Sequence, residues 1–383
     1  MSPLLLVLRW PGVRILLDYR PALRERTGVG EYAHQLAAAL ARLMQPADHL
    51  TLFSSSWKDR LPADRVPGAS VVDARVPVRL LNAAWHRLGW PPVEQFAGAI
   101  DVAHSMHPLL MPARRAARIV TVHDLDFLDH PERTRGEIRR DYASLAPAHA
   151  RRADAVIAVS RFTAGEVERR LGVARDRIFI ASSGAPPWMP RREQPSRGPI
   201  LFMGTLEPRK NVGALLDAYR LLLDRVPDAP PLWLAGSAGN AAAPWLRALE
   251  RPPLAGRVVH LGYITGDRRL DLYTQASMLV LPSHLEGFGI PVLEAMTAGV
   301  PVIVSTGGAL PEVAGDAAPA IPPENAKAFA DAMARYLTDP AAVASAVDKG
   351  LVRSRAYTWD ASARTLLQVY KDVIARRQEI RRN

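Results

Sequence analysis

One stretch of the sequence decides the fold prediction: Glu286-Gly287-Phe288-Gly289-Ile290-Pro291-Val292-Leu293-Glu294. The apolar run at 278–282 precedes it and is typical of a buried strand, whereas residues 290–298 follow the pattern of a helix. Pro291 suits the first turn of that helix, and Gly299 suits its end. The chain is therefore expected to pass from a strand through a glycine-rich turn into a helix N-terminus.

The same stretch predicts a binding site for an anion that also carries hydroxyl groups. The N–H groups of a first helical turn have no partner within the helix and attract anions. Gly287 and Gly289 lack a Cβ, so a ligand can approach the backbone closely. Glu286 and Glu294 would repel phosphate but accept hydrogen bonds from sugar hydroxyls. This combination indicates a nucleotide sugar; the alternative is a helix start with one favourable acid and one buried glutamate.

The composition indicates a globular chain with room for two domains. It has 383 residues, of which 48% are hydrophobic and 23% are charged. There is no cysteine, which excludes disulfides, thiolate metal sites and a cysteine nucleophile. The net charge of +11 favours anionic ligands such as nucleoside diphosphates and acidic lipid headgroups. No basic stretch is interleaved with aromatic residues, so no nucleic-acid partner is expected.

The apolar runs are too short for a membrane span of about 18 residues. Residues 1–8 are apolar but lack a basic n-region, so a signal peptide is not expected; a disordered extension is one alternative, and whether residues 1–10 are ordered stays open. These features favour a cytoplasmic location. Peripheral contact with the inner face of the membrane stays open.

Alternating strands and helices predict an α/β fold with two Rossmann-like, doubly wound parallel sheets facing a central cleft. Residues 1–187 are expected to form one domain and residues 188–358 the other, joined at the proline-rich stretch 186–199. A helix at about 359–383 is expected to pack back on the first domain. The predicted strands are 13–18, 49–53, 70–76, 100–104, 119–123, 155–160, 200–203, 232–235, 258–263, 278–282 and 301–305. The predicted helices are 31–44, 81–96, 137–153, 163–171, 212–226, 268–275, 290–298, 326–337, 341–352 and 359–377.

A second motif, Gly204-Thr205-Leu206-Glu207-Pro208-Arg209-Lys210-Asn211, follows the first strand of the second half. Arg209 and Lys210 are thereby expected at the carboxyl end of that strand, where ligands bind in doubly wound sheets. Two cations there can neutralise the charge on a departing diphosphate. A solvated charge pair before a helix is the alternative. Asn211 is predicted to cap the next helix.

The first half contributes weaker signals. Gly28-Val29-Gly30 precedes a helix and suits either an anion or a plain turn. His123 ends a predicted strand, where it could contact a transferred sugar or be merely a packed residue. Asp124-Leu125-Asp126 matches a metal pattern of another class of sugar transferases, but the expected fold differs, so no metal site is predicted. Asp124 is interpreted as orienting His123 or a backbone turn. Ser160 is interpreted as a helix cap rather than a nucleophile.

At these motifs the chain resembles the retaining GT-B glycosyltransferases of family GT4. The motifs occur in the family's order, and two further family-like pieces follow at 298–302 and 307–313. The form of the motif at 204–211 resembles that of mannosyl- and related transferases of bacterial surface polysaccharides. The resemblance covers nearly the whole chain, and it implies that residues 1–187 are the acceptor-side domain and residues 188–358 the nucleotide-sugar donor domain.

The resemblance implies roles for individual residues. Glu294 would bind the donor ribose, whereas Glu286 and His123 would contact the transferred sugar. Lys210, with Arg209 nearby, would hold the diphosphate. Many relatives carry arginine where this chain has Thr205, which leaves that phosphate contact open. The residues implied as catalytic are His123, Glu286 and Lys210; those implied to bind the donor are Gly30, Gly204, Thr205, Arg209, Lys210, Gly287, Phe288, Gly289, Ile290 and Glu294.

The implied activity is that of a hexosyltransferase of EC 2.4.1 type. It would move a hexose, with mannose favoured, from a GDP- or UDP-sugar to a hydroxyl of a glycan or lipid-linked oligosaccharide. The anomeric configuration would be retained, and neither metal nor cofactor would be required because the nucleotide sugar is a substrate. A basic first domain would suit contact with anionic membrane. The rival interpretations are a nucleotide-sugar epimerase, a phosphorolytic enzyme of the same fold, and a non-catalytic sugar-nucleotide-binding partner.

Overall fold

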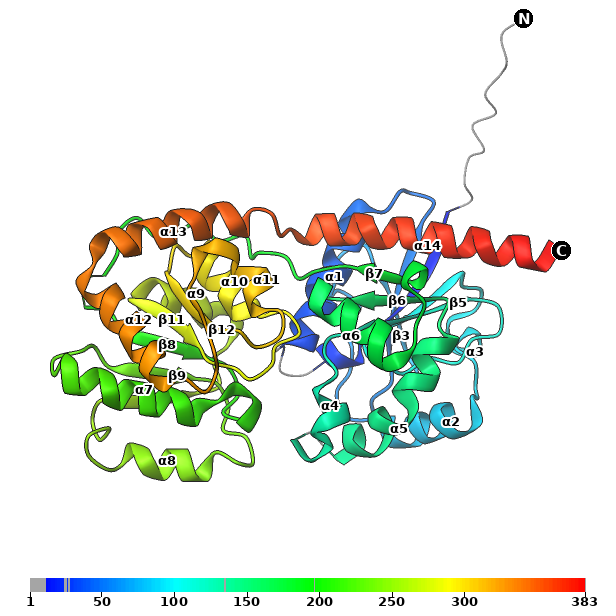
Figure 1. Cartoon of the computed structure of the whole chain (residues 1–383). Coiled ribbons are helices and arrows are strands. Elements are labelled where there is room, and N and C mark those ends of the chain that lie inside the picture. Colours follow the sequence, from blue (N-terminus) through cyan, green and yellow to red (C-terminus); the bar gives the residue numbers. More distant parts are fainter. Residues whose placement is uncertain (1–11, 24–25, 27, 134–135, 196, 383) are drawn as a thin grey trace, which may run out of the picture.

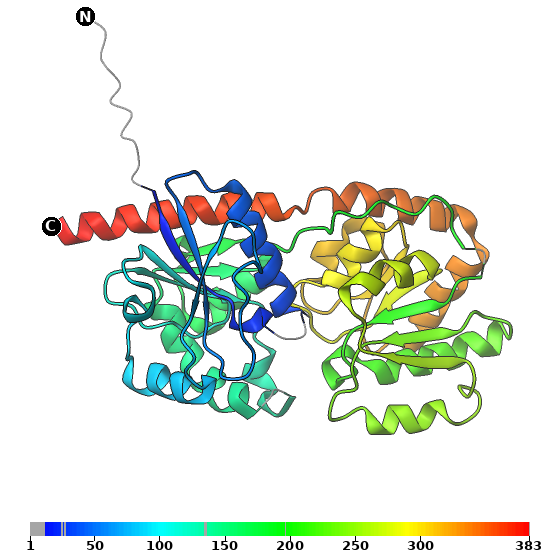
Figure 2. The ribbon, with the colours of Figure 1, turned by 180° about the vertical axis from the view of Figure 1, so that it is seen from behind.

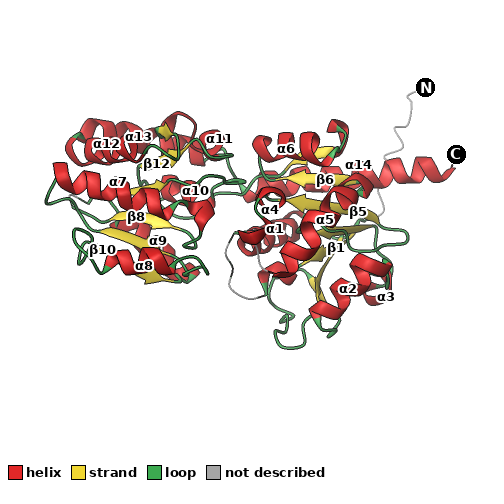
Figure 3. Ribbon diagram, turned by 60° about the horizontal axis from the view of Figure 1, so that its bottom comes forward, coloured by secondary structure: helices red, strands yellow, loops and turns green. Residues whose placement is uncertain are grey.

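Two α/β halves lie side by side, and each consists of a parallel sheet between layers of helices (Figures 1 and 3). The computed structural model describes residues 12–382 except 24, 25, 27, 134, 135 and 196, so residues 1–10, whose order the sequence left open, lie outside the described residues. The chain crosses to the second half near residues 185–199 and returns at its end (Figure 2). This arrangement confirms the prediction of an α/β chain with two doubly wound sheets. The domain boundary predicted at residues 187 and 188 stays a prediction.

The first sheet has seven strands among the described residues, in the order β3-β2-β1-β4-β5-β6-β7, and all of them pair in parallel. Its strands are β1 (Arg14–Asp18), β2 (His49–Ser54), β3 (Ser70–Asp73), β4 (Val102–Ser105), β5 (Ala117–Val122), β6 (Ala155–Ala158) and β7 (Ile178–Ile180). The helices of this half are α1 (Val29–Leu43), α2 (Val78–Leu88), α3 (Glu94–Ala97), α4 (Asp126–Asp129), α5 (Gly136–Arg152) and α6 (Arg161–Leu171), with 3-10 turns at Arg20–Ala22, Pro131–Arg133 and Arg175–Arg177.

Strand β1 illustrates why the strands read as apolar runs. Ile15 and Leu17 share a core with Leu36 of α1 on one face of the sheet. Leu16, which lies between them, belongs to a separate core with Trp85 of α2 on the other face. Because helices cover both faces, every interior position of the strand is buried and the sequence does not alternate with polar residues.

The second sheet has six strands among the described residues, in the order β10-β9-β8-β11-β12-β13, again all parallel. Its strands are β8 (Ile200–Met203), β9 (Leu232–Ala235), β10 (Val258–Gly262), β11 (Met278–Leu281), β12 (Val302–Ser305) and β13 (Ala320–Ile321). The helices are α7 (Val212–Arg225), α8 (Ala243–Leu249), α9 (Gly266–Gln275), α10 (Ile290–Thr297), α11 (Leu310–Ala314), α12 (Ala326–Thr338), α13 (Pro340–Ser354) and the long α14 (Trp359–Arg382), with 3-10 turns at Pro208–Lys210 and Gly315–Ala317.

Two local predictions are wrong. The single helix predicted over 81–96 is two helices, because α2 ends at Gly89 in the left-handed region (φ 61°) and prolines 91 and 92 follow. Asn211 does not cap α7 with its side chain. Its backbone is left-handed, and its side-chain amide instead donates to the carbonyl oxygens of Pro282 (3.1 Å) and Pro323 (2.8 Å), which joins two loops.

The short elements β7, β13, α8 and α11 were not predicted because none spans enough residues to show a period.

Helix α14 returns from the second half and packs along α1 of the first half (Figure 1). Ser362 donates a hydrogen bond to the carbonyl oxygen of Ser182 (2.6 Å). Deeper in the fold, the Tyr370 hydroxyl lies 2.6 Å from Nδ1 of the buried His104. Arg377 pairs with Asp154 at 2.7 Å. The last helix is therefore an integral part of the first half. No helix in the described ranges is both long and apolar enough to cross a membrane.

The contact between Tyr370 and His104 should contribute measurably to stability. Burial lowers the pKa of His104 to about 3, so the ring is neutral and needs both a donor and an acceptor. Its other nitrogen already lies 2.9 Å from the Thr121 hydroxyl. Tyr370→Phe would leave a buried ring nitrogen without its partner, and we expect the free energy of unfolding to fall by about 1 to 3 kcal/mol in urea titrations.

The matched control for this prediction is Arg364→Ala, at an exposed position of the same helix. It should change the free energy of unfolding by less than about 0.5 kcal/mol. If Tyr370→Phe were as stable as the wild type, the hydrogen bond would contribute nothing and the account of α14 would be wrong.

Candidate active site

A cavity of about 280 Å³ lies between the two halves. Its lining residues follow the carboxyl ends of strands from both sheets, which is where ligands bind in doubly wound folds. Two motifs of the second half, one after β8 and one after β11, form much of its wall. The predicted site residues in its lining are His123, Gly204, Thr205, Arg209, Lys210, Glu286, Gly287, Phe288, Gly289, Ile290 and Glu294. The structure therefore brings together residues that are far apart in the sequence.

Gly30 is the one predicted site residue that does not line this cavity. A Cβ on Gly30 would lie 2.6 Å from the carbonyl oxygen of Pro21, so close packing accounts for the glycine. Its neighbours Gly28 and Val29 line the cavity instead. The contact between Gly30 and a diphosphate stays a prediction, and the geometry points to the two preceding residues.

Glu286 is a buried carboxylate held by two cations. Lys210 Nζ lies 2.6 Å from its Oε1, and Arg209 Nη1 lies 3.3 Å from its Oε2. The Ser283 hydroxyl also donates to Oε1 at 2.7 Å. Burial alone would raise the pKa of Glu286, but the two cations outweigh it and lower the pKa. Glu286 is therefore an ionised hydrogen-bond acceptor at neutral pH.

Arg209 connects this carboxylate to the other half of the molecule. Besides Glu286, its guanidinium lies 3.1 Å from Glu207 and 3.6 Å from Asp124, which follows β5 in the first half. These three carboxylates outweigh the effect of burial and raise its pKa. Arg209 therefore keeps its charge and crosses the cavity between the halves.

Glu294 lies one turn inside α10 and is 4% exposed. Its Oε1 accepts from Arg269 at 2.6 Å, and its Oε2 accepts from the Tyr273 hydroxyl at 2.9 Å. Burial raises its pKa to about 7, although Arg269 and Tyr273 oppose the increase. Its ionisation thus changes close to neutral pH.

His123 is a neutral hydrogen-bonding group facing the cavity. Burial lowers its pKa to about 4, so the ring is uncharged at neutral pH. Its Nε2 lies 3.2 Å from the carbonyl oxygen of Met106, which can only accept, so Nε2 carries the proton. This leaves Nδ1 as an acceptor for a ligand hydroxyl.

Gly287 lacks a side chain for a reason that the sequence did not indicate. A Cβ there would lie 1.7 Å from the carbonyl oxygen of His123, so the first half, rather than a ligand, approaches this glycine. The Gly287 carbonyl in turn accepts from the hydroxyls of Ser160 (2.7 Å) and Thr163 (3.2 Å). Ser160 also accepts from the Thr163 amide, which confirms it as the cap of α6. This turn is thus a contact between the two halves.

Two residues that hold Glu294 were missed: Arg269, which lines the cavity, and Tyr273, which lies behind Glu294. They are four residues apart on the predicted helix 268–275, a spacing that places them on one face. That spacing could have indicated a functional face of the helix, but two neighbouring arginines at 268 and 269 are equally typical of a solvent-exposed helix surface. Arg26, which also lines the cavity, had no signal in the sequence.

The aspartates that resemble a metal motif have another role in this structure. Asp124 Oδ1 accepts from the Asp126 amide at 3.2 Å, so it stabilises a backbone turn as predicted. Within the described residues, no group of three or more His, Asp or Glu side chains is arranged to hold a metal ion.

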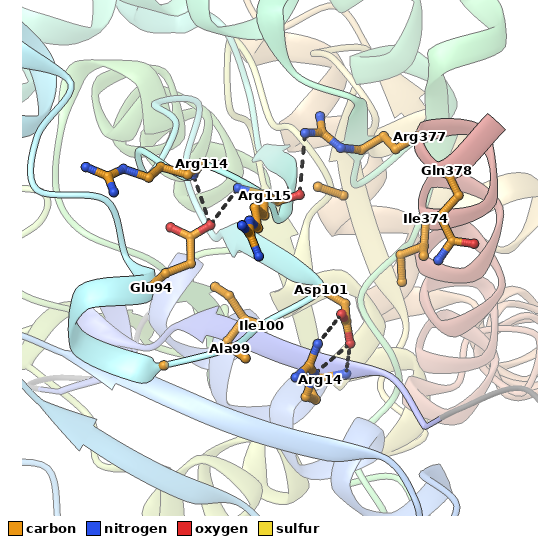
Figure 4. A pocket seen from close by; sticks show the side chains of 12 residues that line it. Arg14, Glu94, Ala99, Ile100, Asp101, Arg114, Arg115, Ile374, Arg377 and Gln378 are labelled. Carbon is orange, nitrogen blue, oxygen red and sulfur yellow. Dashed lines mark hydrogen bonds and ion pairs between the residues drawn. The ribbon is translucent and has the colours of Figure 1, made fainter. Parts of the chain in front are cut away.

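A larger cavity of about 540 Å³ lies at the opposite edge of the first sheet (Figure 4). It is bordered by the starts of β1, β4 and β5 and by α14. Its arginines Arg14 and Arg377 are paired with Asp101 and Asp154, each at 2.7 Å. None of the predicted site residues lies there, so the smaller cavity between the halves is the candidate active site.

Comparison with known proteins agrees with this geometry. Residues 26–187 match the family model of Glycosyltransferase Family 4, and residues 197–339 match the model of Glycosyl transferases group 1. The chain is 29% identical to O-antigen chain mannosyltransferase B of Escherichia coli, over 94% of this chain and 100% of that protein.

Solved structures show the same fold. A sucrose-phosphate synthase from Thermosynechococcus elongatus superposes with a TM-score of 0.78 at 21% identity, over 95% of this chain and 99% of that one. Anabaena HepE in complex with UDP and glucose superposes with a TM-score of 0.70 at 16% identity, over 94% and 99% of the two chains. The chain therefore belongs to the GT4, group 1 glycosyltransferases of GT-B fold, which transfer a sugar from a nucleotide sugar.

Proposed function

We propose that this enzyme transfers a hexose, with mannose favoured, from a GDP- or UDP-sugar to a hydroxyl of a glycan or lipid-linked oligosaccharide, with retention of configuration and without a metal. One observation carries the proposal. The two carboxylates of the glycine-rich motif, Glu286 and Glu294, line a single cavity with Lys210 and Arg209, in a place where both halves contribute. A sugar diphosphate needs this combination of cations and hydrogen-bond acceptors.

The donor is proposed to lie along the start of α10. The ribose hydroxyls would donate to Glu294 at one end. The diphosphate would meet the N–H groups of the first turn of α10, whose N-cap is Gly289. Lys210 and Arg209 would face the phosphate next to the sugar, and the sugar hydroxyls would reach Glu286 and Nδ1 of His123. The 2.6 Å ion pair between Lys210 and Glu286 holds both groups in place before the donor arrives.

The proposed chemistry uses the leaving group as the base. The bond between the anomeric carbon and the phosphate oxygen breaks while the acceptor oxygen bonds to that carbon from the same face. The acceptor proton passes to the departing phosphate oxygen, and a nucleoside diphosphate is released. Lys210 and Arg209 stabilise the charge that develops on it.

The acids of the cavity support this mechanism over a covalent one. Four carboxylates line the cavity in the described part of the chain, and each lies within 3.6 Å of a cation; they are Asp124, Glu207, Glu286 and Glu294. A carboxylate committed to a cation is a poor nucleophile for an anomeric carbon. His123 is neutral, and because its Nε2 donates to the Met106 carbonyl, its Nδ1 is left to accept a hydrogen bond from the sugar.

The preference for mannose and for a polysaccharide acceptor rests on the relative from Escherichia coli, an O-antigen chain mannosyltransferase that matches over its full length. HepE, which has the same fold, is seen with UDP and glucose, so the donor base and sugar are the parts of the proposal that most need a test.

A surface on the first half supports contact with anionic membrane. The outer face of α2 and the segment after it expose Leu80 (65%), Leu88 (75%) and Trp90 (55%), and Arg79 and Arg87 are exposed among them. Exposed leucine and tryptophan mixed with arginine is typical of helices that lie in a membrane interface. We propose that this face of α2 brings the enzyme to a lipid-linked acceptor.

The first prediction concerns catalysis. Lys210→Ala and Glu286→Ala should each lower the rate of GDP release from GDP-mannose, with octyl α-mannoside as acceptor, by about 100-fold or more, because each removes a contact to the reacting groups. NMR of the product should show an α-linked mannose. Glu324→Ala, at an exposed position, is the control. Wild-type rates in both variants would refute the assignment of these two residues, and activity with UDP-glucose alone would refute mannose.

The second prediction concerns pH. The pKa of Glu294 is raised to about 7, so the carboxylate is ionised above that pH and protonated below it. Only the ionised form accepts two ribose hydroxyls, so binding of GDP-mannose should weaken on the order of tenfold from pH 8 to pH 6. The diphosphate diester does not titrate in this range, and neither does His123. Isothermal titration with Glu294→Gln should give weaker binding without this pH dependence; an unchanged pH dependence would exclude Glu294 as its source.

The third prediction concerns the membrane. The protein should pellet with phosphatidylglycerol vesicles at low salt and be released at high salt. Leu80→Glu combined with Leu88→Glu should abolish pelleting, because it places negative charge on the proposed contact face. Val352→Glu alters an apolar side chain that is 68% exposed on the second half and should pellet like the wild type. If the α2 variant also pelleted normally, this face would not be the membrane contact.

A further inference from the structure

Arg269 lies between two carboxylates that belong to different halves of the molecule. Its Nη1 lies 2.6 Å from Glu294 in the second half, and its Nη2 lies 3.3 Å from Glu31 in the first turn of α1 in the first half. The side chains of Arg269, Glu294 and Glu31 are 16%, 6% and 13% exposed, so solvent screens their charges weakly. One guanidinium thus makes two directed contacts through separate nitrogens.

Both ends of this contact are fixed by their own surroundings. Gln35 donates to the other oxygen of Glu31 at 2.9 Å, one turn further along α1. Tyr273 donates to the other oxygen of Glu294 at 2.9 Å. The first turn of α1 also carries Val29, which lines the donor cavity. A larger separation of the halves would therefore part Glu31 from Arg269 and withdraw Val29 from the cavity at the same time.

The charges of the three groups are coupled. Burial and nearby Glu31 raise the pKa of Glu294, while Arg269 lowers it. Burial would lower the pKa of Arg269, but Glu294 and Glu31 outweigh it and raise that pKa, so the guanidinium stays charged. If Glu31 moved away, Arg269 would stay paired with Glu294 through its other nitrogen, so Glu294 would keep its partner while the first half lost its contact with α9.

We propose that Glu31 and Arg269 are positioning residues that link closure of the two halves to the donor-binding carboxylate Glu294. This inference rests on the proposed function in that Glu294 contacts the donor. Arg269 orients Glu294 in any arrangement of the halves. In the arrangement of this structure, which the proposal takes as the closed one, Glu31 pairs with Arg269 while Gly28 and Val29 line the donor cavity; opening would separate Glu31 from Arg269.

A second contact between the halves offers a matched comparison. The Glu312 carboxylate accepts from the backbone amides of Arg161 (2.9 Å) and Phe162 (3.0 Å), at the start of α6. Glu312 does not line the donor cavity. Its loss should favour opening without involving Arg269, so its effect should be independent of the Arg269 contact.

The test measures closure and turnover separately. The chain has no cysteine, so Arg87→Cys in α2 and Arg247→Cys in α8, both exposed, provide the sole thiols for a pair of dyes. In this background we expect Glu31→Gln and Arg269→Lys to lower energy transfer, with and without GDP. In the protein without dyes, each should reduce turnover of GDP-mannose at least fivefold and change the dissociation constant of GDP less than twofold. Arg269→Gln should weaken GDP binding as well, because it also releases Glu294.

A double-mutant cycle identifies the partners. Glu31→Gln should add little to Arg269→Lys, whereas Glu312→Gln should multiply the effect of Arg269→Lys. Energy transfer and turnover of Glu31→Gln equal to the wild type would overturn the proposal, and so would full additivity of Glu31→Gln with Arg269→Lys. A loss of melting temperature alone, without the split between turnover and GDP affinity, would show a merely structural role and would also overturn it.

The same experiment separates this inference from the proposed function. If the wild type neither binds GDP-mannose nor releases GDP from it, the proposed donor is wrong. Energy transfer in the ligand-free protein then still reports whether Glu31 and Arg269 hold the halves together. If the wild type is active but closure is insensitive to both variants, only the inference fails.

Discussion

Burial of the Glu286 carboxylate constrains the whole centre of the molecule. An ionised carboxylate in a site that excludes water is tolerated only with charged partners, and Glu286 has Lys210 and Arg209. The two cations follow β8 and the carboxylate follows β11, which are neighbouring strands. Arg209 extends the same network to Asp124 in the first half. One set of charges thus aligns two loops of one sheet with a strand end of the other.

Contact between the halves and recognition of the donor use the same short motif. Gly287 has no side chain because the His123 carbonyl occupies that space, and its own carbonyl accepts hydroxyl hydrogen bonds from the first half. The glutamates on either side point into the cavity. An enzyme that must exclude water from a reactive sugar benefits from this arrangement, since closing the cavity and completing the site become one event.

Much of the architecture was predictable because it follows from local patterns. Apolar runs separated by helical periods indicated parallel sheets, and the carboxyl ends of parallel strands share an edge. That rule placed Lys210, Glu286 and Glu294 together before any coordinates. The break between α2 and α3 was missed because apolar spacing continued across Gly89, and Asn211 was misjudged because its residue type suits a cap while its backbone is left-handed. Both errors arose where a turn overrides a residue preference.

The sequence by itself determined the fold class, the strand–turn–helix units and the charged residues at the strand ends, because each depends on residues close together in the chain. The tertiary structure alone decided which groups meet across the two halves. Ser160 reaches Gly287, Tyr370 reaches His104, and Arg269 reaches Glu31. No spacing in the sequence encodes contacts between residues more than a hundred positions apart. They arise only when two separately folded sheets, and the helix that returns to the first of them, are packed against each other.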